Sequence, residues 1–279
     1  MLNWRRRGKV ETFEMVLDGL AAPVTVRRSP RARRFSLSVN EALRNGVLTI
    51  PQHASLEEAG RFLARNLDWL QSRLAAMPEP VPFAHGRIIP LRGLEHRICF
   101  TATARGRGAV WTRAPEASRE VAADWDGAAG RGAPLPEICV AGEARHAPRR
   151  LKDWLKAQAR KDLTARSWWH AERLGLKPSR ITIRDQSTRW GSCSANGVLS
   201  YSWRVILAPP FVLDYLAAHE VAHLREMNHS KDFWALVRET MPRMEEGRRW
   251  LRTHGRSLHR YGVEEEPEGG RAQEAREAL

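Results

Sequence analysis

The 279-residue sequence has little cysteine. Its three cysteines, Cys99, Cys139 and Cys193, are far apart and odd in number. Disulfide frameworks are built from even sets of cysteines, and free thiols persist in reducing compartments. The pattern therefore argues against a disulfide-stapled fold, and we expect the protein to be cytoplasmic.

Long apolar runs are also missing. No segment reaches the roughly 18 consecutive apolar residues that a membrane helix requires. Residues 1–9 are basic, but no apolar stretch follows them as it would in a secretory signal. We expect neither a membrane-spanning segment nor a membrane partner.

Acidic residues are the minority among the charged ones. Lys and Arg number 46 against 32 Asp and Glu, which gives a net charge of +14. Clustered basic residues attract polyanions because phosphate binding releases counterions. The densest cluster, residues 27–34, lies between two strand-like runs and is interpreted as a hairpin turn or a polyanion-binding patch. The basic charge favours nucleic acid as a partner, but no nucleic-acid-binding motif accompanies the cluster. The sequence therefore neither establishes nor excludes this partner.

Hydrophobic residues make up 42% of the chain, which is enough for a packed core. Near the N-terminus, short β-branched or alternating segments predict a small antiparallel sheet, with Asn45-Gly46 as a hairpin turn. These segments are residues 24–26, 35–39 and 47–50. A helix over residues 55–74 should follow, because Ser55 and Glu58 form a capping-box pattern.

The domain organisation is predicted from composition. Residues 101–136 are rich in Gly, Ala, Arg and Pro and form a loose loop, which we take as a boundary. We predict a mainly β region with one helix over 1–136 and a second region over 137–262. The second region should contain a long helix near residues 147–174, whose apolar stripe starts at Leu151, and a later hairpin that turns at Asn196-Gly197. Residues 263–279 are predicted to be a disordered acidic tail.

The motif that carries chemistry is His219-Glu220-Val221-Ala222-His223. It lies in a predicted helix that Pro209-Pro210 would begin. Two histidines four residues apart share one helix face and can bind one cation, while Glu220, one step round the helix, can act as general base on a metal-bound water. The simpler interpretation is a solvated helix with two histidines.

A third ligand favours the metal interpretation. Catalytic zinc sites use three protein ligands and leave one position open, and His229 follows His223 by six residues. The chain must turn to bring His229 back, and Asn228 is suited to a left-handed turn. Ser230 can then cap a helix over 231–240. Metzincins share this spacing, but Glu226 replaces their glycine and no Met-turn signature is found, so metzincins are excluded.

The surrounding residues closely resemble the YgjP-like metallopeptidase family, a zincin group similar to the SprT-like proteases. The resemblance rests on Arg189-Trp190-Gly191-Ser192-Cys193-Ser194, on Trp203-Arg204, and on residues 209–234 with HEVAH and Asn228-His229-Ser230. It implies an α+β fold, a zincin-like metalloprotease domain with an N-terminal antiparallel β region. It further implies that His219, His223 and His229 bind one Zn²⁺ and that Glu220 is the catalytic acid/base.

We therefore expect a zinc metallopeptidase that cleaves peptide bonds with a Glu220-activated, zinc-bound water and takes a peptide or protein substrate. By the same resemblance, a strand beside the metal should bind that substrate in extended form. Two alternatives stay open: a metal-dependent hydrolase of another bond, such as a nucleotide phosphoanhydride, and a DNA-associated SprT-like protease. The sequence does not indicate an oligomeric state.

Other residues receive weaker assignments. Tyr201, Arg204 and Tyr261 are candidates for stabilising the oxyanion. His170 is interpreted as a packing or surface histidine and Cys193 as a small buried hydrophobe. Trp190 and Trp203 are interpreted as core residues.

Overall fold

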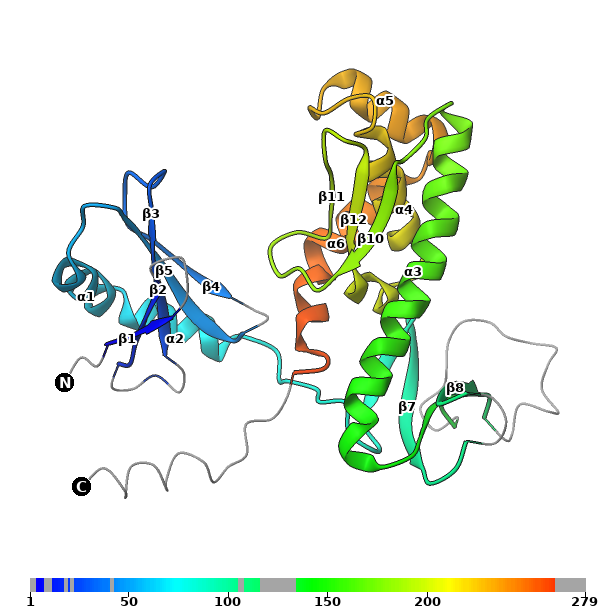
Figure 1. The fold of residues 1–279 in the computed structure, drawn as a ribbon, viewed down its shortest axis with the longest axis horizontal. Coiled ribbons are helices and arrows are strands. Elements are labelled where there is room, and N and C mark those ends of the chain that lie inside the picture. The colour runs from blue at the N-terminus through cyan, green and yellow to red at the C-terminus, as the bar shows by residue number, and fades with distance from the viewer. Residues whose placement is uncertain are drawn as a thin grey trace. The chain divides into compact units, whose positions relative to one another are not determined.

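The fold is α+β, as predicted, and it divides into two compact units, residues 1–79 and 80–279 (Figure 1). The computed structural model describes residues 4–7, 12–17, 20, 23–40, 43–104, 108–115 and 134–263. Most of the predicted loop and, apart from Val263, the predicted acidic tail lie outside the described residues.

The first unit contains a five-stranded sheet in the order β1-β2-β3-β5-β4. Its strands are β1 (Trp4–Arg7), β2 (Thr12–Met15), β3 (Val24–Ser29), β4 (Ser36–Asn40) and β5 (Asn45–Pro51). Neighbouring strands are antiparallel, except that β3 and β5 are parallel. The predicted antiparallel β region is confirmed, with one parallel pair inside it.

The basic cluster at residues 27–34 is not a hairpin turn, because β5 lies between β3 and β4. Leu48 of β5 pairs with Val26 on one side and with Leu37 on the other. The apolar strand β5 takes the interior position between β3 and β4. The basic segment that connects β3 to β4 must therefore cross over β5. Nor is Asn45-Gly46 the turn: both residues lie in β5, where a Cβ on Gly46 would come within 2.9 Å of Leu70.

Two helices cover this sheet instead of the single one predicted. They are α1 (Leu56–Arg65) and α2 (Leu67–Ala75). The capping box is confirmed: Ser55 Oγ accepts from Glu58 N at 3.1 Å, and Glu58 Oε2 accepts from Ser55 N at 2.8 Å. The break falls at Asn66, whose side-chain amide donates to the Phe62 carbonyl at 2.8 Å. Asn competes for helix carbonyls in this way, which explains the interruption.

The second unit begins with a four-stranded sheet in the order β6-β7-β9-β8. Its strands are β6 (Ile88–Leu91), β7 (Leu94–Thr101), β8 (Val110–Arg113) and β9 (Glu137–Ala141). Because β9 is hydrogen-bonded to both β7 and β8, residues on the two sides of position 136 share one sheet. The compact units therefore separate after residue 79, not at the loop that the composition indicated.

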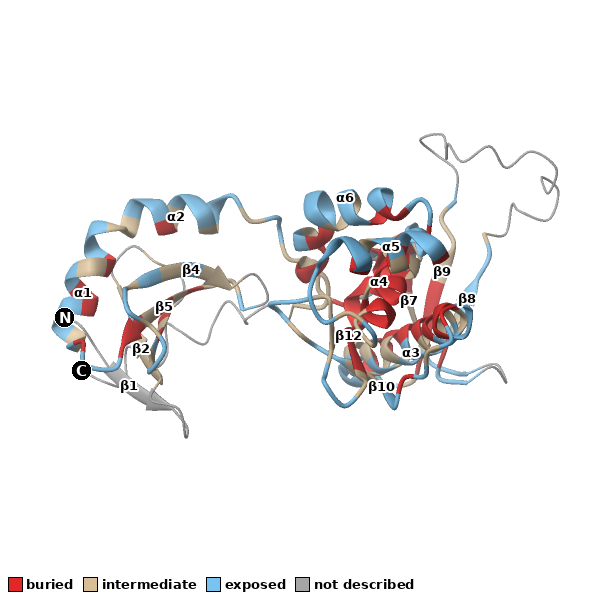
Figure 2. Ribbon diagram, turned by 90° about the horizontal axis from the view of Figure 1, so that it is seen from above, coloured by how far each residue is buried: buried red, intermediate tan, exposed pale blue. Residues whose placement is uncertain are grey.

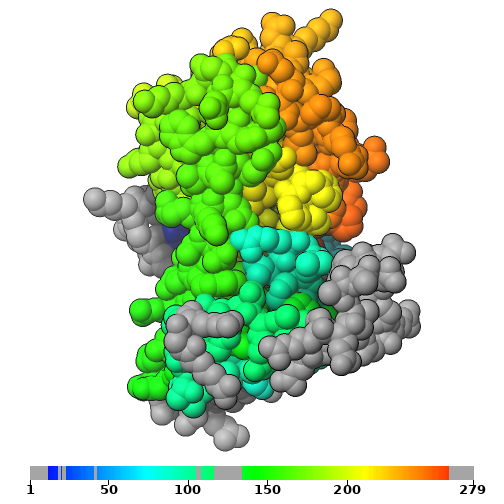
Figure 3. All heavy atoms as spheres, turned by 90° about the vertical axis from the view of Figure 1, so that its right-hand side faces the viewer, coloured from blue at the N-terminus to red at the C-terminus, as the bar shows by residue number. Residues whose placement is uncertain are grey.

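A long helix, α3 (Ala147–Arg173), follows η2 (Ala144–His146) and lies along one side of this unit (Figure 3). Its buried stripe repeats every four residues at Leu151, Leu155, Ala159 and Leu163. The predicted helix is confirmed. Like every other helix among the described residues, α3 lacks the combination of length and apolarity needed to cross a membrane.

The remaining elements contain or surround residues 219–223, which form the HExxH motif. They are β10 (Arg180–Arg184), β11 (Gly191–Cys193), β12 (Val198–Ser202), η3 (Trp203–Leu207), α4 (Pro210–Ala222), α5 (Lys231–Thr240), α6 (Met244–His254) and η4 (Gly255–Arg260). The strand order is β10-β12-β11, and Gly197, at φ +70°, closes the predicted turn between β11 and β12. Helix α4 is buried along most of its length among α3, α5 and α6 (Figure 2).

An ion-pair network joins α3 to α4. Asp214 accepts hydrogen bonds from Arg166 and, at 2.9 Å, from Nε2 of the fully buried His170. Burial alone would raise the pKa of Asp214, but the bonds from His170 and Arg166 outweigh it and hold that pKa below its usual value. His170 is thus a packing histidine, as interpreted from the sequence.

We expect Asp214→Asn to lower the free energy of unfolding by about 1–3 kcal/mol, because it leaves two donors at a partly buried site without their anionic partner. Asp153→Asn is the matched control, since Asp153 is exposed and its cationic partners lie 3.9 and 4.0 Å away. That variant should change stability by less than about 0.5 kcal/mol. Urea unfolding of both variants checks this, and equal effects would contradict it.

Candidate metal centre

The first two histidines of the motif lie at the C-terminal end of α4. Pro210 is the first residue of this helix, and the last is Ala222, one residue before His223. The chain turns at once: the amides of Arg225 and Glu226 both donate to the Ala222 carbonyl. Nδ1 of His223 lies 2.9 Å from the Glu226 carbonyl oxygen. Since a carbonyl only accepts, Nδ1 carries the proton and Nε2 keeps a free lone pair.

The predicted left-handed conformation at Asn228 is wrong. The turn that brings His229 back to the other two histidines is made in another way. Among the described residues, the non-glycine positions with positive φ are Arg44 and Arg92. The chain instead closes with a bond of 2.8 Å from Ser230 N to the Asn228 carbonyl. Ser230 Oγ then accepts from Phe233 N at 3.2 Å and caps α5, which spans the predicted residues.

The structure brings the three histidines together. One ring nitrogen from each of His219, His223 and His229 lies within 4.8 Å of the other two. Nε2 of His229 is 3.2 Å from Nε2 of His219. A tetrahedral ion with Zn–N bonds of about 2.1 Å holds its nitrogen ligands about 3.4 Å apart. The observed spacing therefore fits a single divalent cation.

An apolar wall supports the three rings. The buried Phe233 has its ring centroid 4.9, 4.5 and 4.7 Å from those of His219, His223 and His229. Burial, followed by the other two histidines, lowers the pKa of His219 to about 3, and burial also lowers the pKa of His223. The neutral imidazole is the form that binds metal ions.

Glu220 is enclosed beside this cluster. Its side chain is only 3% exposed, and its Oε2 is buried without a hydrogen-bond partner among the described residues. Burial raises the pKa of Glu220 to about 8, against the opposing positive charge of Arg189. A Cβ on Gly191 of β11 would overlap the Glu220 carboxylate. Buried carboxylates are normally satisfied, so this one is suited to a partner outside the protein.

Of the three oxyanion candidates, Tyr201 and Arg204 have other side-chain partners, and Tyr261 is bound through its main-chain carbonyl. The Tyr201 hydroxyl is fully buried and lies 2.9 Å from Ser167 Oγ. Arg204 donates to Asp185 at 3.1 Å and to the Leu258 and Tyr261 carbonyls at 3.3 and 2.6 Å. These bonds hold the C-terminal segment in place, and no described contact directs these side chains toward the histidines.

The residues interpreted as packing residues do pack. Trp203 is fully buried, and Trp190 and Cys193 pack partly buried against the main core. Burial, with the charge of Glu220, raises the pKa of the Cys193 thiol to about 11. The thiol therefore stays protonated near neutral pH.

Trp190 stacks on His259 with ring centroids 5.0 Å apart. His259 is 4% exposed, and burial together with the charge of Arg204 lowers its pKa to about 4. Unfolded His titrates near 6.5. Between pH 6.5 and 4 the unfolded chain therefore binds more protons, so this contribution to stability is complete above pH 6.5 and is lost as the pH falls toward 4.

Between pH 7.5 and 4.5, the parent is expected to lose about 2–3 kcal/mol more stability than His259→Gln, which has no titrating ring. Urea unfolding in chelator at the two pH values measures the difference. Parallel losses in parent and variant would show that the protonation of His259 is not coupled to folding.

A groove of about 430 Å³ lies between α5 and α6, beside this centre. It is lined by Lys231, Trp234, Arg238, Met244, Glu245 and Arg248. The Trp234 ring lies 5.6 Å from the ring of His229, and Arg248 stands 4.7 Å over the indole. Three cations against one carboxylate make the groove attractive to anions. The sequence analysis missed it, although Lys231, Trp234 and Arg238 share one helix face.

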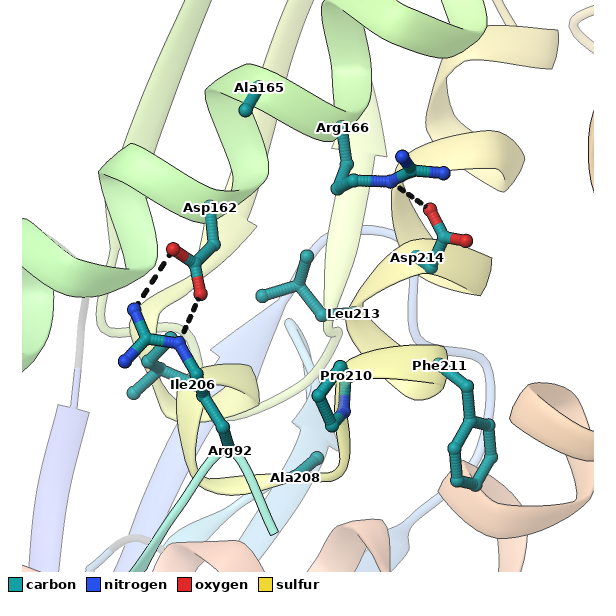
Figure 4. A pocket seen from close by; sticks show the side chains of 10 residues that line it. All are labelled: Arg92, Asp162, Ala165, Arg166, Ile206, Ala208, Pro210, Phe211, Leu213 and Asp214. Atoms are coloured by element: carbon teal, nitrogen blue, oxygen red, sulfur yellow. Dashed lines mark hydrogen bonds and ion pairs between the residues drawn. The ribbon is translucent and has the colours of Figure 1, made fainter.

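A second hollow, of about 460 Å³, lies between α3 and the start of α4 (Figure 4). Arg92 donates to Asp162 at 2.7 and 3.0 Å, and Arg166 pairs with Asp214. Each arginine that lines the hollow thus already has a carboxylate partner. We assign this hollow to the packing of the two helices.

The site combines a helix that carries the HExxH motif, a third histidine that a turn brings back to this motif, and a small sheet beside the helix. This combination is typical of metallopeptidases. A family model described as YgjP-like, metallopeptidase domain, matches residues 33–254. The chain therefore belongs to the YgjP-like family, as the resemblance implied, and membership of a metallopeptidase family implies a bound metal ion.

Among solved structures, the chain is similar to the metallopeptidase zymogen of Pyrococcus abyssi abylysin. The sequence identity is 22% and the TM-score is 0.30, over 33% of this chain and 93% of that chain. A comparison with curated proteins gave no match.

Proposed function

We propose that this protein is a zinc-dependent peptidase in which His219, His223 and His229 hold one zinc ion and Glu220 is the general acid/base. The observation that carries the proposal is the convergence of three imidazole nitrogens beside an enclosed, unpartnered carboxylate. Family membership supports peptide-bond hydrolysis.

The donor set favours a catalytic ion over a structural one. Structural zinc sites are closed by four protein ligands. The histidine cluster supplies three among the described residues, which leaves one position for water or substrate. When bound, zinc would acidify a water molecule toward a pKa of about 7 and polarise the scissile carbonyl.

Glu220 supplies the proton transfers. Its position on α4, one residue after His219, supports a place for the carboxylate beside the open position and not among the ligands. There it would accept the proton of the attacking water and deliver it to the leaving amine. The contact with Gly191 restricts where the carboxylate can lie.

Strand β11 is the proposed substrate-binding strand. It is an edge strand of the β10-β12-β11 sheet, and its first residue, Gly191, contacts Glu220. An edge strand offers main-chain donors and acceptors to an extended peptide. This arrangement favours a peptide or protein substrate over a compact small molecule.

The second candidate function is hydrolysis of a nucleotide phosphoanhydride. The groove beside His229 favours it, because Lys231, Arg238 and Arg248 could bind phosphates while Trp234 stacks on a base. A DNA-associated protease is a further variant of the first function. The exposed arginines among residues 27–34 in the first unit would serve it.

The test is metal analysis followed by parallel assays. Purified protein should contain one zinc ion per chain at the histidine site and should hydrolyse an unfolded protein substrate, with both properties lost in chelator. Hydrolysis of nucleoside triphosphates without peptide cleavage would replace the first function by the second. Steeply salt-dependent DNA binding would support recruitment to DNA. Absence of metal would refute both hydrolases.

A further inference from the structure

A second group of metal-binding side chains lies on the four-stranded sheet of the second unit. Cys99 is on β7, and Glu137 and Cys139 are on β9. One ligand atom from each of the three lies within 4.8 Å of the other two. None of them belongs to α4, α5 or the turn that carries the histidines.

The strand register builds this group. Cys99 pairs directly with Cys139 on the parallel neighbour β9, so both thiols lie on one face of the sheet. Glu137 precedes Cys139 by two residues and shares that face. The alternate residues Ile98, Ile138 and Val140 belong to the main core on the opposite face, together with the buried stripe of α3.

The group is enclosed but can be reached from solvent. Cys139 is fully buried, Cys99 is partly buried, and the side chain of Glu137 is 25% exposed. An ion can therefore enter from the side of Cys99 and Glu137, and water can complete its coordination there.

The carboxylate is already oriented. Arg113, paired with Glu137 across β8 and β9, donates from Nε to Glu137 Oε2 at 2.8 Å. Sγ of Cys139 lies 3.9 Å from the same oxygen. Zn–S of about 2.3 Å and Zn–O of about 2.1 Å at a tetrahedral angle give an S···O separation of about 3.6 Å. A shift of a few tenths of an ångström completes the fit, and outer hydrogen bonds such as that from Arg113 commonly hold ligating carboxylates.

We propose that Cys99, Cys139 and Glu137 form a second metal site, which binds a thiophilic cation, Zn²⁺, in the reduced protein. Two thiolates and one carboxylate are a donor set for this ion, with water in the fourth position. Burial raises the pKa of Cys139 to about 11, so this thiol is protonated without metal and releases its proton on binding. The bound ion would tie β7 to β9 and stabilise the folded state by mass action.

Cobalt titration of the full-length protein in a phosphine reductant tests the site. The parent should show a thiolate-to-cobalt charge-transfer band in the near ultraviolet. The band should persist in the His219→Ala/His223→Ala double variant and vanish in Cys99→Ser and Cys139→Ser. Cys193→Ser is the matched control and should keep it, since Cys193 lies on β11.

A second variant and a second measurement keep the test decisive if a cysteine variant fails to fold. Glu137→Gln keeps both thiols and should weaken cobalt binding by about tenfold or more. Zinc should slow alkylation of Cys99 in the parent but not in Cys139→Ser. No band in the parent, a band that survives Cys99→Ser, or a band lost in Cys193→Ser would overturn the proposal. Peptidase turnover should be unchanged in Cys99→Ser, so failure here is distinct from failure of the proposed function.

Discussion

Glu220→Gln is expected to keep the zinc ion at the histidine site and to lower kcat by about 100- to 10,000-fold, the usual contribution of general acid–base catalysis. The amide has nearly the same shape as the carboxylate, so the fold and the three imidazoles should be undisturbed. It cannot accept a proton from water at neutral pH. Elemental analysis and turnover on an unfolded protein substrate measure the two properties separately.

Two comparison variants sharpen this test. His223→Ala removes a proposed ligand and should lose both the metal at this site and turnover. Glu239→Gln makes the same chemical change at an exposed position of α5 and should alter neither. Full turnover in Glu220→Gln would remove Glu220 from the mechanism, and metal loss in that variant would make it a ligand.

Gly191→Ala is expected to lower kcat by about 100-fold or more while the metal is retained. An added Cβ at this position would overlap the Glu220 carboxylate, so either the side chain or β11 must move. Displacement of a reacting group by about 1 Å can cost a factor of that size. The variant touches no proposed ligand, so metal content should equal that of the parent.

A double variant distinguishes this clash from general damage to β11. Glu220→Asp shortens the side chain and makes room for the new methyl group. The Gly191→Ala/Glu220→Asp protein should therefore lose less activity than the product of the two single losses predicts, which is the sign of direct coupling. Independent effects in the double variant would show that Gly191 does not position the carboxylate.

Local sequence patterns predicted the helices near the site well. Ser230 was expected to cap α5, and it does so through Phe233 N. The stripe beginning at Leu151 predicted α3, and Asn196-Gly197 predicted the turn between β11 and β12. Each signal acts within a few residues, through the helical period, a cap or a turn conformation, so neighbours in sequence suffice to determine it.

Two other local predictions were wrong because other local hydrogen bonds determined the backbone conformation. Asn66 interrupts the helix predicted over 55–74 through its bond to Phe62. Asn228 does not take the left-handed conformation, since the helix ends at Ala222 and the chain turns earlier than the motif spacing indicated. The side-chain bond at Asn66 and the early turn after α4 were not visible in the apolar periodicity.

The sequence by itself determined a candidate ligand set, because that depends on residue types at fixed short spacings, and it carried the family resemblance that implied the α+β class. Tertiary structure alone decided that β6, β7 and β8 share a sheet with β9 and that β5 separates β3 from β4. It also placed Gly191 against Glu220 and Cys99 beside Cys139. Strand pairing and helix packing join segments far apart in the chain. Which segments meet is set by how the apolar faces of all elements are buried together, and no single segment contains that information.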